Sequence, residues 1–434
     1  MKRLFYFALF AIISINVAAF DFELSSVVKH PDKNEIFIAG TFKTIIVLDS
    51  ETGKTIRTFA VDEPISDIEF NQDASMLLAQ VKSKLFLLNP ESGEELFSKN
   101  GYSFQLFEQC PYFIELKAYG DTKVILYDSK NTDVVKEIPL NFQPKECAFD
   151  KEFNNIFITS AKIEIGNSEE KKTLSGKVEK SESYNCYNSA YIKKQDDGFG
   201  SYILKFDIKN DEISKKITCP FDFTATYGFS LLPKGNEIFI ADWDMVIKVD
   251  KKDISTAIEC EDATFNYASN FSDNENFICI ASTKTGILYD IENSEWKEFD
   301  LRDSFEFAYT TDIISYDEKI WLLSKDYTLI AMNYSGEKLD NFKIDDAGDE
   351  GFNVYYHNGY SKQEDRDKEA AIINSLLTEM SFENINLEDY IGKSDVVLAN
   401  FKTATEAQNF CKQLKDNKLQ YVTKIAPADR KTEK

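Results

Sequence analysis

Short apolar runs alternate with polar turns along most of the chain. The run "NEIFIAG" at residues 34–40 returns almost unchanged as "NEIFIAD" at residues 236–242. Each run is followed by a second apolar run that ends in Asp or Asn, then by a polar turn and a third, mixed run. This pattern predicts β-strands joined by tight turns, because Asp, Asn, Ser and Gly bond to nearby backbone groups and tolerate positive φ. The turn residue recurs at Asp49, Asn89, Asp128, Asp207, Asp250, Asp290 and Asn333.

The spacing of these turn residues is nearly constant. It is 40, 39, 79, 43, 40 and 43 residues, and a period near forty with several short strands per unit is typical of a β-propeller. The second strand of each unit is almost wholly apolar, as expected where both faces are buried between neighbouring blades. We therefore predict a mainly β fold, with a seven-bladed β-propeller over residues 20–345. In the first unit we expect strands at residues 25–30, 36–39, 44–48 and 55–59.

The wide gap between Asp128 and Asp207 leaves the number of blades open. From the start of the second strand to the turn residue there are 13 residues in the first unit and 51 in the fourth. The excess is about one blade in length, so eight blades are an alternative. Residues 161–200 are rich in Lys, Glu and Ser and lack a strongly apolar strand. This composition favours seven blades with an insertion in the fourth.

One segment of the first unit resembles a known class of propellers. The segment "IIVLDSETGKTIRTF" at residues 45–59 is similar to the repeats of the YVTN/WD-repeat class. The resemblance extends over about residues 22–345. It implies the propeller fold, and exported bacterial members of the class are common. It implies no particular activity, because one fold serves many functions.

The pattern changes after the last repeat. Residues 346–351 form an acidic linker that contains glycine. We then expect the order βαββαβ, an α+β ferredoxin-like domain, over residues 352–425. Its elements are a strand at 352–357, a helix at 363–380, strands at 383–390 and 395–401, a helix at 403–418 and a strand at 419–425. Residues 426–434 are expected to be a disordered tail.

The second predicted helix has a clear start and a clear buried face. Thr403 and Glu406 form a capping box. An apolar stripe follows at helical spacing, made of Ala407, Phe410, Cys411 and Leu414.

The last part of the chain resembles a SPOR domain. Residues 396–425, "VVLANFKTATEAQNFCKQLKDNKLQYVTKI", are similar to the second half of that family, in which a strand leads into a Ser/Thr-capped helix and a final strand. The matching positions are Val396, Leu398, Ala399, Phe401, Thr403, Ala407, Phe410 and Leu414. The resemblance implies a sheet with helices on one side and an open face that binds peptidoglycan glycan strands, often at division septa. The chain departs from the family at Ala399, where glycine is usual, and in the strand "FNVYYH".

Alternation along the first strand of this domain predicts which side chains reach the open face. If Phe352, Val354 and Tyr356 face the helices, then Asn353, Tyr355 and His357 lie on the other face. Amide, phenol and imidazole groups suit a polysaccharide, because they bond to hydroxyl and N-acetyl groups and offer a ring to sugar C–H faces. With Ala399, which takes the place of the family glycine, these are the candidate glycan-binding residues. Alternatively, the tyrosines only cover a sheet.

The first residues resemble a secretory signal peptide, expected at residues 1–19. Lys2 and Arg3 precede an apolar segment at residues 4–15, and Val17-Ala18-Ala19 gives a small-residue cleavage site. We expect cleavage near Ala19, a periplasmic protein and no membrane insertion afterwards. An uncleaved membrane anchor is the alternative.

The net charge of the chain argues against nucleic acid as a partner. The net charge is −24, with 50 Lys and Arg against 74 Asp and Glu, so we expect no nucleic-acid binding, since phosphates need cationic partners. The chain has seven cysteines without a C-x-x-C pair, which argues against a zinc site. Cys186 and Cys219 are the one candidate disulfide pair.

Candidate catalytic chemistry is sparse. The chain has two histidines, and His30 is expected to be a solvated turn residue. We find none of the usual hydrolase or phosphate-binding motifs, and Asp242 with Asp244 is a poor calcium candidate. We expect the protein to have no enzymatic activity and to bind no cofactor and no metal.

The leading hypothesis is an envelope protein whose propeller binds another envelope protein and whose C-terminal domain binds peptidoglycan. The alternative is a propeller enzyme or small-ligand-binding protein with a purely structural C-terminal domain.

Overall fold

The computed structural model describes most of the chain between residues 24 and 427. The ranges outside the described part are 1–23, 41–43, 62–63, 82, 102, 118–120, 161–162, 165–198, 220–229, 236, 243–244, 250–253, 260–267, 282–284, 302–309, 325–327, 345–350, 358–362, 384–394, 418–422 and 428–434. The predicted signal peptide, most of the insertion and most of the acidic linker fall in these ranges. The chain forms two compact units, of which the larger comprises residues 25–37 and 66–342. The smaller comprises residues 38–65 and 343–434 with the N-terminal residues up to Leu24.

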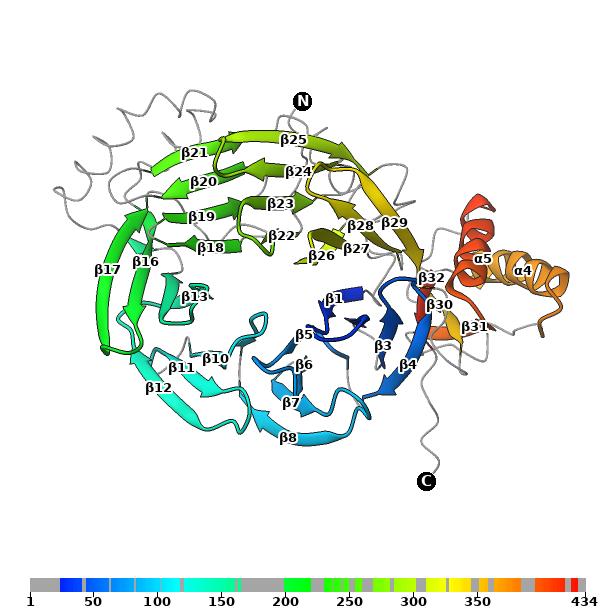
Figure 1. Ribbon diagram of the computed structural model, residues 1–434. Helices are drawn as coiled ribbons and strands as arrows, with labels where there is room; N and C mark the ends of the chain where they lie inside the picture. Colours follow the sequence, from blue (N-terminus) through cyan, green and yellow to red (C-terminus); the bar gives the residue numbers. More distant parts are fainter. Residues whose placement is uncertain are drawn as a thin grey trace. The chain divides into compact units, whose positions relative to one another are not determined.

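The protein is a β-propeller, and its described residues form six antiparallel sheets of four strands each. Within the larger unit the sheets after the first follow one another in chain order, with the first strand of each innermost (Figure 1). The strands of the first three sheets are β1 (Leu24–Lys29), β2 (Glu35–Gly40), β3 (Thr44–Asp49), β4 (Thr55–Ala60), β5 (Asp67–Phe70), β6 (Leu77–Val81), β7 (Lys84–Leu88), β8 (Glu95–Asn100), β9 (Phe104–Gln105), β10 (Tyr112–Lys117), β11 (Lys123–Asp128) and β12 (Val134–Pro139). The other three comprise β18 (Ser230–Lys234), β19 (Glu237–Asp242), β20 (Met245–Val249), β21 (Ile254–Glu259), β22 (Ala268–Phe271), β23 (Phe277–Ala281), β24 (Thr285–Asp290), β25 (Glu295–Asp300), β26 (Thr310–Tyr316), β27 (Lys319–Ser324), β28 (Thr328–Asn333) and β29 (Lys338–Lys343).

The fourth repeat unit differs from the others. Its sheet has five strands, which are β13 (Pro144–Phe149), β14 (Asn155–Ser160), β15 (Ile163–Glu164), β16 (Phe199–Asp207) and β17 (Glu212–Cys219). The prediction of seven four-stranded blades is therefore wrong for this unit, and the structure has six regular blades. The physical reason is the insertion between β14 and the main part of β16. Near its start the chain forms β15, and near its end it forms the first residues of β16, and these two segments pair with each other.

Burial follows the position of a strand within its sheet. The second and third strands are almost fully buried, as in β2 and β3, whereas outer strands such as β8 are largely exposed. Neighbouring sheets share apolar clusters, for example where Ile114 and Val124 meet Ile156 and Leu204. The repeated apolar runs are thus explained by packing between sheets, which a single blade cannot achieve.

The recurring turn residues have the structural role that the sequence predicts. The Asp49 carboxylate accepts hydrogen bonds from the backbone N–H groups of Glu51 and Thr52, at 3.2 and 2.8 Å. Asn89 accepts from Glu91 N in the same way, at 2.8 Å. Such bonds hold the turn between the third and fourth strands. The same arrangement recurs at Asp128, Asp207, Asp290 and Asn333.

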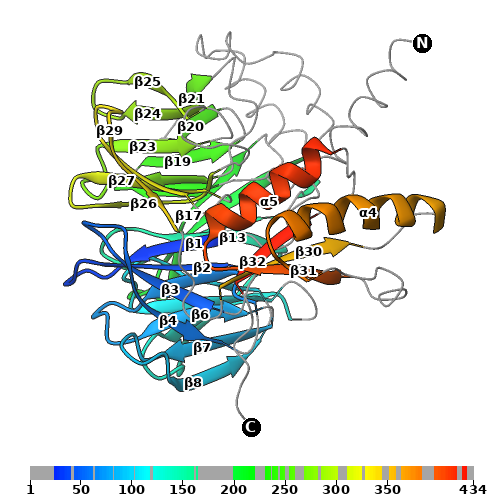
Figure 2. The same ribbon diagram turned by 90° about the vertical axis from the view of Figure 1, so that its right-hand side faces the viewer.

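The C-terminal part of the smaller unit contains a three-stranded antiparallel sheet and two helices (Figure 2). Its elements in chain order are β30 (Phe352–His357), α4 (Gln363–Glu379), β31 (Asp395–Phe401), α5 (Ala404–Asp416) and β32 (Thr423–Pro427). The sheet order is β31-β30-β32. The strand expected at residues 383–390 lies almost entirely outside the described residues. Residues 426 and 427, which were expected to belong to the tail, are part of β32.

The helices of this part have the buried faces that their sequences predict. Ile373 and Leu377 of α4 and Ala407 and Phe410 of α5 have no exposed surface. The capping box at the start of α5 is confirmed, because Glu406 N donates to Thr403 Oγ1 at 3.2 Å and Thr403 N donates to Glu406 Oε2 at 3.3 Å. Among the described residues no helix is long and apolar enough to cross a membrane.

Candidate functional site

One face of the C-terminal sheet carries a row of hydrogen-bonded polar side chains. The register places Asn353 of β30 opposite Asn400 of β31. Asn400 Nδ2 donates a hydrogen bond of 2.9 Å to Asn353 Oδ1, and Asn353 Nδ2 donates one of 3.2 Å to the hydroxyl oxygen of Tyr355. The row therefore crosses two strands, and each member fixes the orientation of the next.

The opposite face of the same sheet is the hydrophobic core of this part. Phe352 and Val354, which alternate with Asn353 along β30, are fully buried. The ring of Phe401 lies 5.3 Å from that of Phe410 on α5, and 4.9 Å from that of Phe382. Since α5 packs on all three strands, the polar row lies on a sheet that is supported from behind.

The structure brings together only part of the predicted site. Asn353 and Tyr355 lie on the same face, as alternation predicts. Ala399 is separate from them, because its partner across the sheet is the buried Val354 and it is itself only 6% exposed. A bulge opposite Val354 and Tyr355 lets two successive residues of β31, Leu398 and Ala399, both be buried.

Two further residues complete the picture of this face. His357 pairs with Asp395 at the end of β30, but its side chain lies outside the described residues. Val397, which lies opposite Tyr355, is 42% exposed and adds an apolar surface beside the phenol ring. Sequence reasoning missed Asn400 and Val397, because their place on this face depends on the register and the bulge.

The polar row and its apolar neighbour combine hydrogen-bonding groups with an aromatic ring and an exposed aliphatic side chain. The amides of Asn353 and Asn400 offer both donors and acceptors, and Tyr355 combines a hydroxyl with an aromatic ring.

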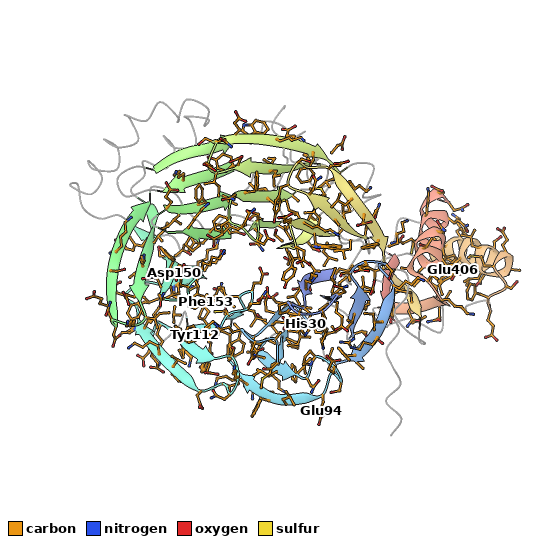
Figure 3. The ribbon with its side chains drawn as sticks, in the orientation of Figure 1. His30, Glu94, Tyr112, Asp150, Phe153 and Glu406 are labelled. Carbon is orange, nitrogen blue, oxygen red and sulfur yellow. The ribbon has the colours of Figure 1, made fainter. Side chains whose placement is uncertain are left out.

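The histidine of the propeller is structural rather than solvated. His30 lies near the centre of the larger unit (Figure 3) and is only 5% exposed, so the expectation of a solvated turn residue is wrong. Its Nδ1 accepts a hydrogen bond of 3.1 Å from Asp32 N, and its ring contacts Phe70 edge-on with centroids 5.0 Å apart. Burial, and then the charge of Lys33, lower the pKa of His30. The imidazole of His30 is therefore neutral, and it accepts a hydrogen bond from the backbone of its own turn.

Other residues near the centre also have structural partners. Asp150 accepts from the backbone N–H groups of Asn154 and Asn155, at 2.9 and 3.0 Å. The rings of Tyr112 and Phe153 both contact Phe149, with centroids 5.9 and 6.1 Å apart (Figure 3). Within the described part of the chain no three His, Cys, Asp or Glu side chains are grouped as a metal site. Of the calcium candidates, Asp242 ends β19 and Asp244 lies outside the described residues.

Several carboxyl groups of the innermost strands have a raised pKa. Burial raises the pKa of Asp67 to about 6, of Asp312 to about 7 and of Glu146 to about 8. Each accepts a backbone hydrogen bond, and two of them do so across a junction between sheets: Asp312 accepts from Val27 and Glu146 from Leu231. These groups therefore join neighbouring sheets.

Sequence comparison adds no relative to this picture. No protein-family model matches the chain, and no curated protein matches it significantly.

Proposed function

We propose that the protein is an exported envelope protein whose C-terminal domain binds the glycan strands of peptidoglycan. The observation that carries this proposal is the row formed by Asn400, Asn353 and Tyr355 on the face of the sheet away from α5. A flat row of amide and phenol groups, beside an apolar side chain, matches the alternating polar and C–H surfaces of a sugar chain. The signal-peptide-like N-terminus supports export.

The strand order supports a ferredoxin-like domain of the SPOR type. The described order β31-β30-β32, all antiparallel, is the order that three of the four strands take in a split βαβ arrangement. In that arrangement the fourth strand follows the first helix and lies at the edge of the sheet, on the side of β31.

For the propeller we propose the role of a protein-binding scaffold. The outer strands of several sheets expose large apolar side chains, which include Phe97, Val134, Ile213 and Trp296. Exposed apolar groups that recur around a rigid platform support contact with another protein.

The proposed glycan site is tested by sedimentation with purified, amidase-treated sacculi. We expect the full-length protein to pellet with them, and the double variant Asn353→Ala/Tyr355→Ala to remain in the supernatant. The matched control is Gln413→Ala, an exposed residue of α5 on the other side of the sheet, which should pellet like the wild type. Undiminished pelleting of a folded double variant would remove this face from the site.

A further inference from the structure

The strand that follows the recurring turn is the last in each four-stranded sheet. In the sheet made of β22 to β25 this edge strand is β25, the outermost of the four (Figure 1). An edge strand turns every second N–H and C=O group outward, where another strand can pair with them. Among the described residues no strand pairs with the outer edge of β25.

Most of the outer strands contain a β-bulge, which protects such an edge. The pairing with the neighbouring strand shifts by one residue within β4, β8, β12, β17 and β21. A bulge twists the edge and hinders regular pairing with another chain. The strand β25 differs, because its register with β24 is unbroken from Glu295 to Asp300. The edge of β25 is therefore suited to accept a further strand.

This edge also carries an exposed aromatic side chain. Trp296 is 45% exposed and lies opposite the buried Tyr289 of β24. Tryptophan is enriched at the centres of protein interfaces, where its large ring buries much apolar surface. Phe97 of β8 is exposed to the same extent, 45%, but it lies next to the bulge of its strand. Trp296 thus combines an exposed ring with an unbroken edge.

The residues on either side of Trp296 have opposite charges. Glu295 and Lys297 are both exposed, and alternation places them on one face of the sheet and Trp296 on the other. Lys297 Nζ also donates a hydrogen bond to Ser335 O in the turn of the next sheet. A carboxylate, an indole ring and an ammonium group therefore follow one another along the edge.

This order of residues is complementary to itself. Two antiparallel strands related by a two-fold axis place a residue opposite its own copy at the axis. With Trp296 at the axis the two rings face each other, and Glu295 of each copy lies opposite Lys297 of the other. Moving the axis by one residue puts Glu295 opposite Glu295 or Lys297 opposite Lys297. Since directly opposed like charges are destabilising, the charges favour the register centred on Trp296.

We propose that two copies of this chain associate through antiparallel pairing of their β25 edges, centred on Trp296. The two sheets then form one continuous sheet across a two-fold axis. A second copy is the partner that fits this edge, because each copy supplies the ring and both charges that the other needs. The pairing involves β25 alone, so it depends neither on glycan binding nor on the proposed scaffold role.

The overall charge makes the local charges decisive. The net charge of −24 causes two chains to repel each other, and Lys297 is the one cationic residue of β25. We therefore expect a weak dimer that forms or fails according to the two Glu295–Lys297 pairs.

Sedimentation velocity of the full-length protein over a range of concentrations tests the dimer. We expect a monomer at low concentration and a dimer as the concentration rises to about 100 µM, because small interfaces are weak. Lys297→Glu and Glu295→Lys each replace two attractive pairs by two repulsive ones. Each variant alone should therefore raise the dissociation constant at least about tenfold.

Mixing the two charge variants gives the sharper result. In equal amounts they should associate about as tightly as the wild type, because every opposed pair in the mixed dimer again joins a carboxylate to an ammonium group. The double variant Glu295→Lys/Lys297→Glu should dimerise by itself for the same reason.

The matched control for the aromatic ring is Phe97→Ser, which removes an equally exposed ring from the bulged strand β8. It should dimerise like the wild type, whereas Trp296→Ser should weaken the dimer at least about tenfold. The proposal is overturned if the wild type remains a monomer at every concentration. It is equally overturned if the single charge variants dimerise like the wild type, or if their mixture does not associate.

Discussion

Asn400 lies directly opposite Asn353 across the first two strands of the C-terminal sheet, and its amide donates a hydrogen bond of 2.9 Å to the Asn353 oxygen. This contact aligns the Asn353 amide group, so that its nitrogen points toward Tyr355. Three side chains from two strands thus act as one surface. Asn400, which is not among the positions that resemble the SPOR family, should therefore contribute to glycan binding.

We predict that Asn400→Ala weakens glycan binding by about five- to tenfold, which corresponds to about one hydrogen bond. The expected loss of affinity has two causes. The Asn400 side chain no longer contacts the glycan, and Asn353 is no longer held in one orientation. Isothermal titration of the full-length variant with soluble glycan fragments measures the effect. Asn417→Ala, an exposed asparagine after α5, is the control and should bind as the wild type. Equal affinities of Asn400→Ala and the control would mean that Asn400 does not contact the glycan.

The raised pKa of the Glu146 carboxyl group predicts a pH dependence of stability. Its pKa is raised to about 8 by burial, partly offset by the bond from Leu231 N. Since the folded pKa lies above the unfolded value, its contribution to stability is lost as pH rises from about 4 to about 8. Glu146→Gln keeps an acceptor for Leu231 N but does not titrate. Its melting temperature should exceed that of the wild type at pH 8.5 by a few degrees and should match it at pH 5. A wild-type melting temperature that is higher at both pH values would contradict this assignment.

Four cysteines should be inert in the native protein. Cys110, Cys147, Cys279 and Cys411 are buried free thiols, and burial raises the pKa of the first three. Because the thiolate is the reactive form, we expect none of the four to react with a thiol reagent until the protein is unfolded. Peptide mass spectrometry after labelling, with and without denaturant, identifies the modified positions. Labelling of Cys279 under native conditions would show that the sixth sheet opens.

A glycine of the sixth sheet makes room for an aromatic ring. Gly286 of β24 lies opposite Phe299 of β25, and a Cβ atom at this position would lie 1.9 Å from the ring. Gly286→Ala should therefore lower the free energy of unfolding by about 1–3 kcal/mol through overpacking. Adding Phe299→Leu should recover part of this loss, whereas Phe299→Leu alone should destabilise by leaving a cavity. Chemical denaturation of the three variants measures the free energy of unfolding of each. If the losses from the two single substitutions simply add in the double variant, the contact between positions 286 and 299 is refuted.

The propeller could be predicted from the sequence because its signal is repeated. Buried second strands and turn residues such as Asp49 recur at a nearly constant period, and each copy independently supports the same unit. For the fourth unit the sequence predicted an insertion but not the five-stranded sheet, because β15 and the start of β16 lie at the ends of a segment of polar composition.

The candidate site was only partly predictable, for a physical reason. Alternation along one strand places Asn353 and Tyr355 on one face, but it does not say which residues of the next strand lie beside them. That depends on register, and the bulge near Val354 turns Ala399 inward while Asn400 remains outside. His30 was misjudged because its turn looks polar, although the ring packs against Phe70 from the next sheet.

The most direct test of the central claim is calorimetric titration of the full-length protein with soluble glycan strands that lack stem peptides. The account predicts saturable binding by the wild type and by Gln413→Ala, and no measurable binding by a folded Asn353→Ala/Tyr355→Ala variant. Equal binding by all three proteins, or no binding by the wild type, would contradict it.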